Sequence, residues 1–226
     1  MTPEQIQQKI FFGYAKAAYK LGASFNLYRS ATPLNPIDEE NLIGVIQMST
    51  SVSWDYMKAS KYGNSVFNAC IDAQASSAPL NAQKGDYLIP FEDSEDQRTY
   101  FVQSLQFDLP PQVVQCNRIL SVIRPSQETG PGVVGYSGYT PGTSEVIMTG
   151  MYASVLKEGR GEAAPSKLPT DVREPNWVIY MPNLGNVPLR VGDIAIDDLG
   201  QNYAIYSNEL TDLGWRLSAT QVINDG

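Results

Sequence analysis

Gly85-Asp86-Tyr87-Leu88-Ile89 is followed by Tyr100-Phe101-Val102-Gln103-Ser104, and Gly192-Asp193-Ile194-Ala195-Ile196 is followed by Tyr203-Ala204-Ile205-Tyr206-Ser207. Each unit consists of a Gly-Asp turn, an apolar strand, an acidic loop and a strand of the form Tyr-x-apolar-x-Ser. The two Gly-Asp pairs are 107 residues apart. Strand-turn-strand patterns also recur by chance in chains made mostly of strands, but we interpret this recurrence as duplication of a small β module.

An amphipathic helix precedes the repeated part of the chain. Thr2 is suited to the N-cap, Pro3 to the first helical position, and Gln5 completes a capping box with Thr2. Apolar residues then recur every three or four positions, and Gly22 is a natural stop. We therefore predict a helix over residues 3–21 that packs either on its own sheet or on a neighbouring subunit.

The remaining residues alternate between short apolar runs and turn-forming segments, which predicts a mainly β fold. We expect an N-terminal helix followed by two related small β-barrel or β-sandwich modules. The assigned segments are the helix over 1–22, the first β module over 23–125, a Gly/Pro-rich linker or arm over 126–142, and the second β module over 143–226. Strands are expected at residues 24–29, 42–54, 66–71, 86–91, 99–107, 113–123, 144–156, 177–181 and 213–222, with a long surface loop over 157–175.

Composition narrows the functions that the chain can perform. It has no histidine, which removes the common general base, the commonest transition-metal ligand and every Ser-His or Cys-His pair. A formal net charge of −8 does not favour binding to nucleic acid or to an anionic membrane. No apolar run approaches the roughly 20 residues that span a bilayer. The first residues lack the features of a signal peptide, so we expect the protein to stay in the cytoplasm where it is made.

The acidic residues are interpreted as structural rather than catalytic. The densest charge run comprises Glu92, Asp93, Glu95 and Asp96. It lacks the ligand spacing of a calcium loop and is typical of a solvated hairpin tip, as is Asp197-Asp198 in the second unit. Asp86 and Asp193 are expected to be turn formers whose carboxylates accept hydrogen bonds from nearby backbone N–H groups.

The cysteines, tryptophans and clustered glycines are also interpreted as structural. Cys70 and Cys116 are expected to be buried free thiols, because two cysteines make neither a disulfide framework nor a zinc site. Trp54 and Trp215 are expected to belong to the core. The glycines between residues 130 and 138 lack the helix and the Lys-Ser/Thr of a phosphate loop. We assign no catalytic, cofactor-binding or metal-ligating residue.

Several short strings of residues, spread over most of the chain, carry a resemblance to a known class of proteins, although no motif among them carries chemistry. In the first half the likeness rests on Tyr62-Gly63-Asn64-Ser65-Val66-Phe67, Gly85-Asp86-Tyr87-Leu88, Thr99-Tyr100-Phe101-Val102, Gln115-Cys116-Asn117-Arg118 and Ser121-Val122-Ile123-Arg124-Pro125. In the second half it rests on Gly192-Asp193-Ile194, Asp197-Asp198-Leu199-Gly200-Gln201-Asn202-Tyr203 and Thr211-Asp212-Leu213-Gly214-Trp215. Together these strings resemble structural proteins of tailed bacteriophages. The second half also looks like the small β modules of head–tail joining proteins.

The resemblance implies a non-enzymatic structural component of a tailed-phage virion, in the neck or tail. Such a protein would act in head–tail connection or tail assembly, be assembled in the bacterial host cytoplasm, and contact other virion proteins and copies of itself. It implies no cofactor, no membrane and no specific nucleic acid as partner. Three alternatives remain open: a fibre-attachment protein of the tail, a carbohydrate- or ligand-binding β-sandwich with exposed aromatic side chains in a groove, and a hydrolase with two carboxylates in one cleft.

Overall fold

The computed structural model describes residues 2–51, 65–72, 82–92, 96–105, 109–125, 144–157 and 176–222. It confirms a mainly β fold with one N-terminal helix, α1 (Pro3–Leu21). The first six strands are β1 (Ala23–Tyr28), β2 (Leu42–Ser51), β3 (Val66–Ile71), β4 (Tyr87–Pro90), β5 (Thr99–Ser104) and β6 (Gln112–Cys116). The next six are β7 (Arg118–Pro125), β8 (Ser144–Lys157), β9 (Asn176–Met181), β10 (Ile194–Asp197), β11 (Asn202–Thr211) and β12 (Gly214–Val222). A short 3-10 helix, η1 (Glu39–Asn41), precedes β2.

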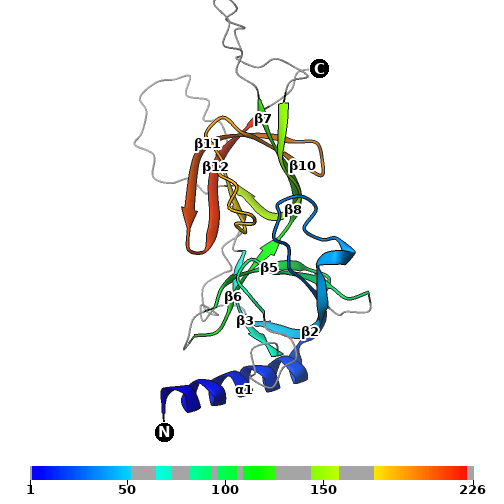
Figure 1. Ribbon diagram of the computed structural model, residues 1–226, viewed down its shortest axis with the longest axis vertical. Helices are drawn as coiled ribbons and strands as arrows, with labels where there is room; N and C mark the ends of the chain where they lie inside the picture. The colour runs from blue at the N-terminus through cyan, green and yellow to red at the C-terminus, as the bar shows by residue number, and fades with distance from the viewer. Residues whose placement is uncertain are drawn as a thin grey trace, which may run out of the picture.

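The twelve strands form two closed barrels of the same topology (Figure 1). Neighbouring strands follow the order β1-β2-β3-β6-β5-β4 in the first barrel and β7-β8-β9-β12-β11-β10 in the second. Pairing of β1 with β4 closes the first barrel, and pairing of β7 with β10 closes the second. Each barrel has a register shift at the same place, after Val102 in β5 and after Ile205 in β11. The two halves are therefore related by structure as well as by sequence pattern.

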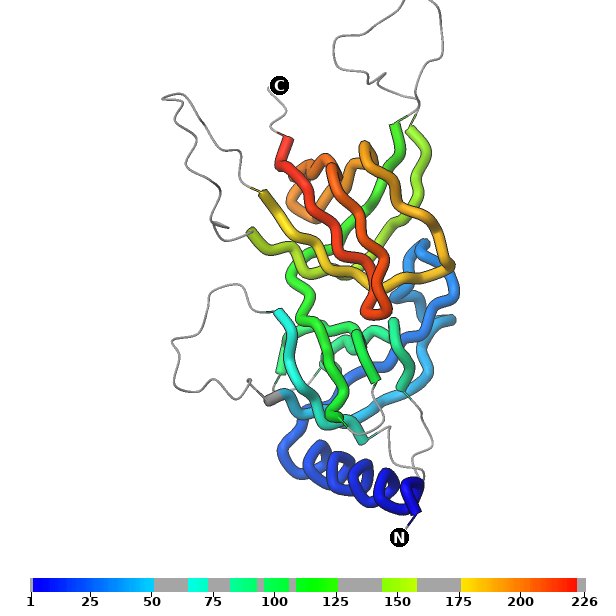
Figure 2. Tube along the Cα trace, turned by 90° about the vertical axis from the view of Figure 1, so that its left-hand side faces the viewer, coloured from blue at the N-terminus to red at the C-terminus, as the bar shows by residue number. Residues whose placement is uncertain are grey.

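The helix α1 begins and packs as its sequence predicts. The Thr2 hydroxyl accepts from the Gln5 N–H and the Gln5 side chain accepts from the Thr2 N–H, which completes the capping box. The helix contacts β2 and β3 at the end of the first barrel that lies away from the second (Figure 2), with Ala18 fully buried. Gly22 ends α1 in an extended conformation (φ −94°), so glycine is not required there by a left-handed backbone. A Cβ there would collide with the Ala18 carbonyl and the Met48 backbone.

The boundary between the two β modules lies earlier than the sequence predicts. The run predicted as one strand over 113–123 is two strands, separated at Asn117, and β7 pairs with β8 and β10 of the second barrel. The first module therefore ends at Cys116 instead of residue 125. The prediction was wrong because apolar alternation continues from β6 into β7, although the two strands face different cores.

Several of the predictions fall on residues whose structure is not described. The proposed linker, residues 126–142, lies outside the described residues. So does the loop predicted over 157–175, apart from Lys157, which ends β8. Trp54 is also outside them, whereas Trp215 is buried as expected.

Buried side chains fill both barrels and join them end to end. The first barrel encloses apolar residues that include Phe25, Leu27 and Tyr100. A second cluster fills the other barrel and extends across the junction to Tyr87 and Phe101 of the first. The Tyr87 hydroxyl donates to the Tyr152 carbonyl on β8 at 2.9 Å, so the junction combines apolar packing with a specific hydrogen bond.

Candidate functional site

An arginine–aspartate pair recurs at the closing seam of each barrel. In the first barrel, Arg29 follows β1 and Asp86 precedes β4. The Arg29 guanidinium donates to both Asp86 carboxylate oxygens, at 2.9 and 2.8 Å, and the Gln83 N–H donates to the same carboxylate at 2.7 Å. Asp86 is 1% exposed, and its carboxylate raises the pKa of Arg29.

The second barrel repeats this arrangement. Arg124 in β7 donates to both oxygens of Asp193 at 2.8 and 2.9 Å, and the Arg190 N–H donates to the carboxylate at 2.7 Å. The preceding glycines, Gly85 and Gly192, have φ of +90° and +94°, a conformation that side chains disfavour. In each barrel the Gly-Asp turn therefore places a buried carboxylate within hydrogen-bonding distance of an arginine at the end of the barrel's first strand.

The sequence predicted part of this arrangement. Asp86 and Asp193 do accept hydrogen bonds from backbone N–H groups of their own turns, as expected. Their arginine partners were missed. The sequence does contain a signal for these partners: Arg29 and Arg124 each follow two apolar residues at the end of the first strand of a barrel. The signal is hidden when β7 is counted as part of the first module.

A second duplicated contact lies at the acidic turns. The Tyr203 hydroxyl donates to Asp197 at 3.2 Å, and Asp197 also accepts from two N–H groups of its turn. Burial and the Asp197 carboxylate raise the pKa of Tyr203 to about 12. In the first barrel, the Tyr100 hydroxyl donates to Asp96 at 3.0 Å. Burial opposes ionisation of Asp96, but hydrogen bonds from Arg98 and Tyr100 outweigh it and lower the Asp96 pKa.

These contacts change the interpretation of the acidic turns as solvated tips. Glu92 is exposed as expected, but Asp197 is 6% exposed and forms an ion pair with Arg118 at 3.5 Å. Asp93 and Glu95 lie outside the described residues. The sequence missed the burial of Asp197 because a charged pair in a turn is ordinarily exposed, and the tyrosine partner comes from the following strand.

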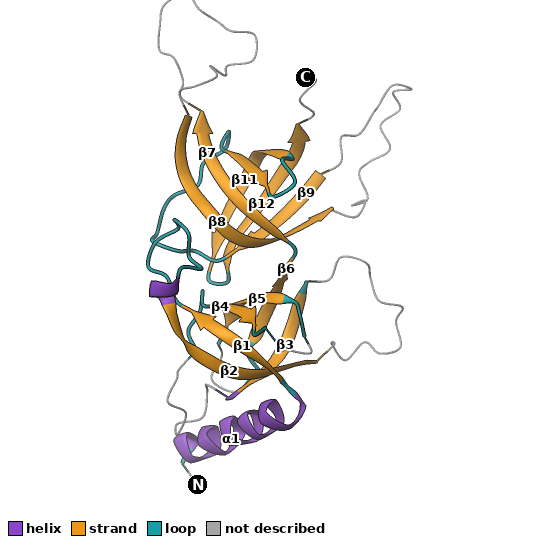
Figure 3. Cartoon of the chain, turned by 90° about the vertical axis from the view of Figure 1, so that its right-hand side faces the viewer, coloured by secondary structure: helices purple, strands orange, loops and turns teal. Residues whose placement is uncertain are grey.

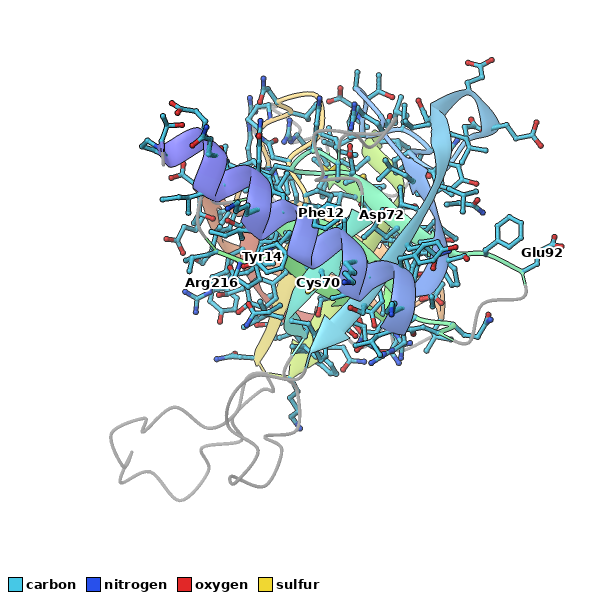
Figure 4. The ribbon with its side chains drawn as sticks, turned by 90° about the horizontal axis from the view of Figure 1, so that it is seen from below. Phe12, Tyr14, Cys70, Asp72, Glu92 and Arg216 are labelled. Atoms are coloured by element: carbon cyan, nitrogen blue, oxygen red, sulfur yellow. The ribbon has the colours of Figure 1, made fainter. Side chains whose placement is uncertain are left out.

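The two cysteines lie in different surroundings. Cys116 is buried and free, as expected, and burial raises its pKa. Cys70 is also free but only half-buried, on the surface of β3 that α1 covers (Figure 4). Burial raises the pKa of Cys70 too, so both thiols are held in the protonated form that reacts slowly.

A groove lies where the two barrels meet. Two adjoining cavities, of about 330 and 560 Å³, share Lys84 from the first barrel and Thr211, Asp212 and Leu213 from the turn between β11 and β12. The other described lining residues are Gly85, Val102, Gln103, Ser104, Leu105, Pro182, Asn183, Leu210 and Gly214.

The described lining of this groove combines few charged groups with exposed apolar side chains. It offers one cation, Lys84, and one carboxylate, Asp212, beside the partly exposed Leu210 and Leu213. A carboxylate hydrolase would need two acidic groups, and the described lining supplies one. A carbohydrate site would be expected to present aromatic side chains, and none of the described lining residues is aromatic.

Exposed apolar side chains also occur on convex surfaces of the first barrel. Phe12 and Tyr19 on α1 are 65% and 78% exposed, and Ile43 and Val45 on β2 are 41% and 49% exposed. Figure 4 looks directly onto α1 and labels Phe12 along it. Apolar side chains gathered on a surface commonly mark contacts with other proteins.

Comparison with known proteins identifies no relative: no family model, curated protein or solved structure matches the chain. In the part of the chain that the structure describes, no helix has both the length and the apolar character needed to cross a membrane. Within the same residues, no three His, Cys, Asp or Glu side chains converge in a way that would hold a metal ion.

Proposed function

We propose that the protein is a non-enzymatic structural component of a tailed-phage virion, located in the neck or tail and acting through assembly with other virion proteins and with itself. The observation that carries this proposal is the distribution of exposed apolar side chains. Several of them lie on the outer faces of α1 and β2 and beside the groove between the barrels, and surfaces of this kind are suited to protein contacts.

The architecture supports the same proposal. Each barrel is closed by pairing of its first strand with its fourth, β1 with β4 and β7 with β10, and buried side chains fill both interiors. Duplicated rigid modules with filled cores present defined outer surfaces, which is what a component of a symmetric particle needs. The chain's resemblance in pattern to phage structural proteins points to the particle in which such surfaces would be used.

Removal of the gene from a phage that carries it tests the proposal. We expect lysates to contain filled heads that lack a complete neck or tail, visible by negative-stain electron microscopy, with infectivity restored when the gene is supplied in trans. Normal numbers of complete, infectious particles in the deletion lysate would contradict a structural role.

A further inference from the structure

The outer face of α1 combines aromatic and basic side chains. The residues on it are Lys9, Phe12, Lys16, Tyr19 and Lys20, all of which are exposed. At about 100° per residue they fall within an arc of about 100°, on the side of the helix opposite the buried Ala18. We call these five residues the helix face.

The helix face differs in charge from the rest of the molecule. Three lysines against Glu4 give α1 a formal charge of +2 in a chain whose total is −8, so the residues outside α1 carry −10. None of the ion pairs found between described residues involves a lysine of α1. The helix face is therefore a basic, partly apolar surface on an acidic protein.

A surface of the opposite character lies at the start of β2. Asp38, Glu39 and Glu40 are exposed around η1. Ile43 and Val45, two positions apart in β2, expose 41% and 49% of their surface on the outside of the barrel. None of the ion pairs between described residues uses these three carboxylates. We call these five residues the β2 face.

We propose that the helix face of one copy of this chain docks on the β2 face of a second copy. The aromatic rings of Phe12 and Tyr19 would cover Ile43 and Val45, while the lysines of α1 would lie against the carboxylates around η1. The two faces carry opposite charges, and both expose apolar side chains.

The two faces do not meet within one chain. Figure 3 places α1 across the far end of the first barrel and η1 beside the junction with the second barrel. Because the faces are different surfaces, the contact is heterologous, and repeated contacts produce a closed ring or a filament. The inference deepens the proposed assembly function and rests on it for its role in the particle.

Self-association of the purified full-length chain tests the contact. We expect wild-type protein to form a species larger than the monomer at about 1 to about 100 µM, measured by sedimentation velocity and light scattering. Charge reversal on either side, Lys16→Glu with Lys20→Glu or Glu39→Lys with Glu40→Lys, should weaken association about tenfold or more. Combining the four substitutions in one chain should restore it.

Two further variants separate the contact from general effects on charge and folding. Phe12→Ser with Tyr19→Ser should weaken association without changing net charge. Lys157→Glu reverses an exposed lysine on the second barrel and should leave association unchanged. Circular dichroism should show the same secondary structure in every variant, since all the substituted side chains are exposed.

The inference is overturned if the wild-type chain remains a monomer at about 100 µM, or if the reversals on α1 and η1 leave its oligomeric state unchanged. These outcomes are distinguishable from failure of the proposed function. A monomer that is nevertheless incorporated into particles overturns the contact alone. An oligomer that the reversals dissociate, from a gene whose deletion leaves particles complete, overturns the proposed function alone.

Discussion

The guanidinium of Arg124 donates hydrogen bonds to both carboxylate oxygens of Asp193, at 2.8 and 2.9 Å, across the seam where β7 pairs with β10. Asp193 is 2% exposed and Arg124 is only partly so. The same geometry recurs between Arg29 and Asp86 at the seam of β1 and β4. In each barrel, a bidentate guanidinium and a backbone N–H of the turn bind one buried carboxylate. This contact fixes the register in which the two closing strands pair.

Arg124→Leu should destabilise the protein because it leaves a buried carboxylate without its cation. We expect the free energy of unfolding to fall by about 2–3 kcal/mol, measured by urea denaturation, since the Arg190 N–H still donates to Asp193. Arg216→Leu is the control: its pair with Glu209 spans 3.7 Å and both side chains are more than half exposed. The control should change stability by less than about 0.5 kcal/mol, and equal losses in the two variants would contradict the account.

Gly22→Ala should loosen the attachment of α1 to the first barrel. The added Cβ would collide with the Ala18 carbonyl and the backbone of Met48, and backbone cannot move aside as a flexible side chain can. We expect a loss of more than about 1 kcal/mol in unfolding free energy and a lower Tm. Gly13→Ala is the matched control, because nothing lies within 4 Å of its Cβ position.

The control should have the opposite sign. Gly13 lies in the interior of α1, where alanine is favoured over glycine by about 0.5–1 kcal/mol. A stabilised Gly13→Ala protein beside a destabilised Gly22→Ala protein would show that space, rather than helix propensity, determines the effect at residue 22. Equal stabilisation by both substitutions would contradict the packing of α1.

The buried tyrosine at the second acidic turn should make stability fall at high pH. The pKa of Tyr203 is raised from 10.0 to about 12. Below pH 10 the hydroxyl is protonated in both states, so its contribution is fully present; between pH 10 and pH 12 the unfolded chain releases the proton while the folded chain keeps it. The free energy of unfolding should therefore decline as pH rises above 10, measured by urea denaturation at a series of pH values.

Tyr203→Phe should make that decline shallower without abolishing it, because it removes one of several groups whose pKa is raised in the folded state. Tyr19→Phe, at a side chain that is 78% exposed, is the comparison and should leave the slope as it is. If the two variants and the wild-type chain lost stability in parallel above pH 10, the burial of Tyr203 against Asp197 would be contradicted.

Asn117→Ala should weaken the connection between the barrels. The Asn117 amide donates to the Val155 carbonyl at 2.9 Å and accepts from the Val155 N–H at 2.8 Å. Because Asn117 lies between β6 and β7, these two bonds attach the segment that connects the barrels to β8. We expect a loss of about 1–3 kcal/mol in unfolding free energy. Asn183→Ala, whose amide donates to Asn186 in an exposed turn, should cost less.

The sequence predicted local structure well wherever the signal was local. The capping box at Thr2, the helix to Leu21 and the strand over Val66–Ile71 were predicted from neighbouring residues and are confirmed. The duplication was also visible in the sequence as the repeated Gly-Asp turn, and the structure gives Gly85 and Gly192 nearly the same φ.

The features that the sequence did not predict depend on contacts between distant residues. The division at Asn117 was hidden because the strands on either side are both apolar, and only pairing with β8 and β10 shows that β7 belongs to the second barrel. The ion pair of Arg29 with Asp86 joins residues 57 positions apart, and the groove forms only when the barrels meet. The periodicity of apolar residues gives no information about which distant residues come into contact.

Quantitative mass spectrometry of purified phage particles tests the central claim most directly. The account predicts that this chain is present in particles that carry its gene, at a fixed ratio to the other structural proteins and unaffected by washing at high salt. Absence of the chain from particles in which other minor structural proteins are readily detected would contradict it.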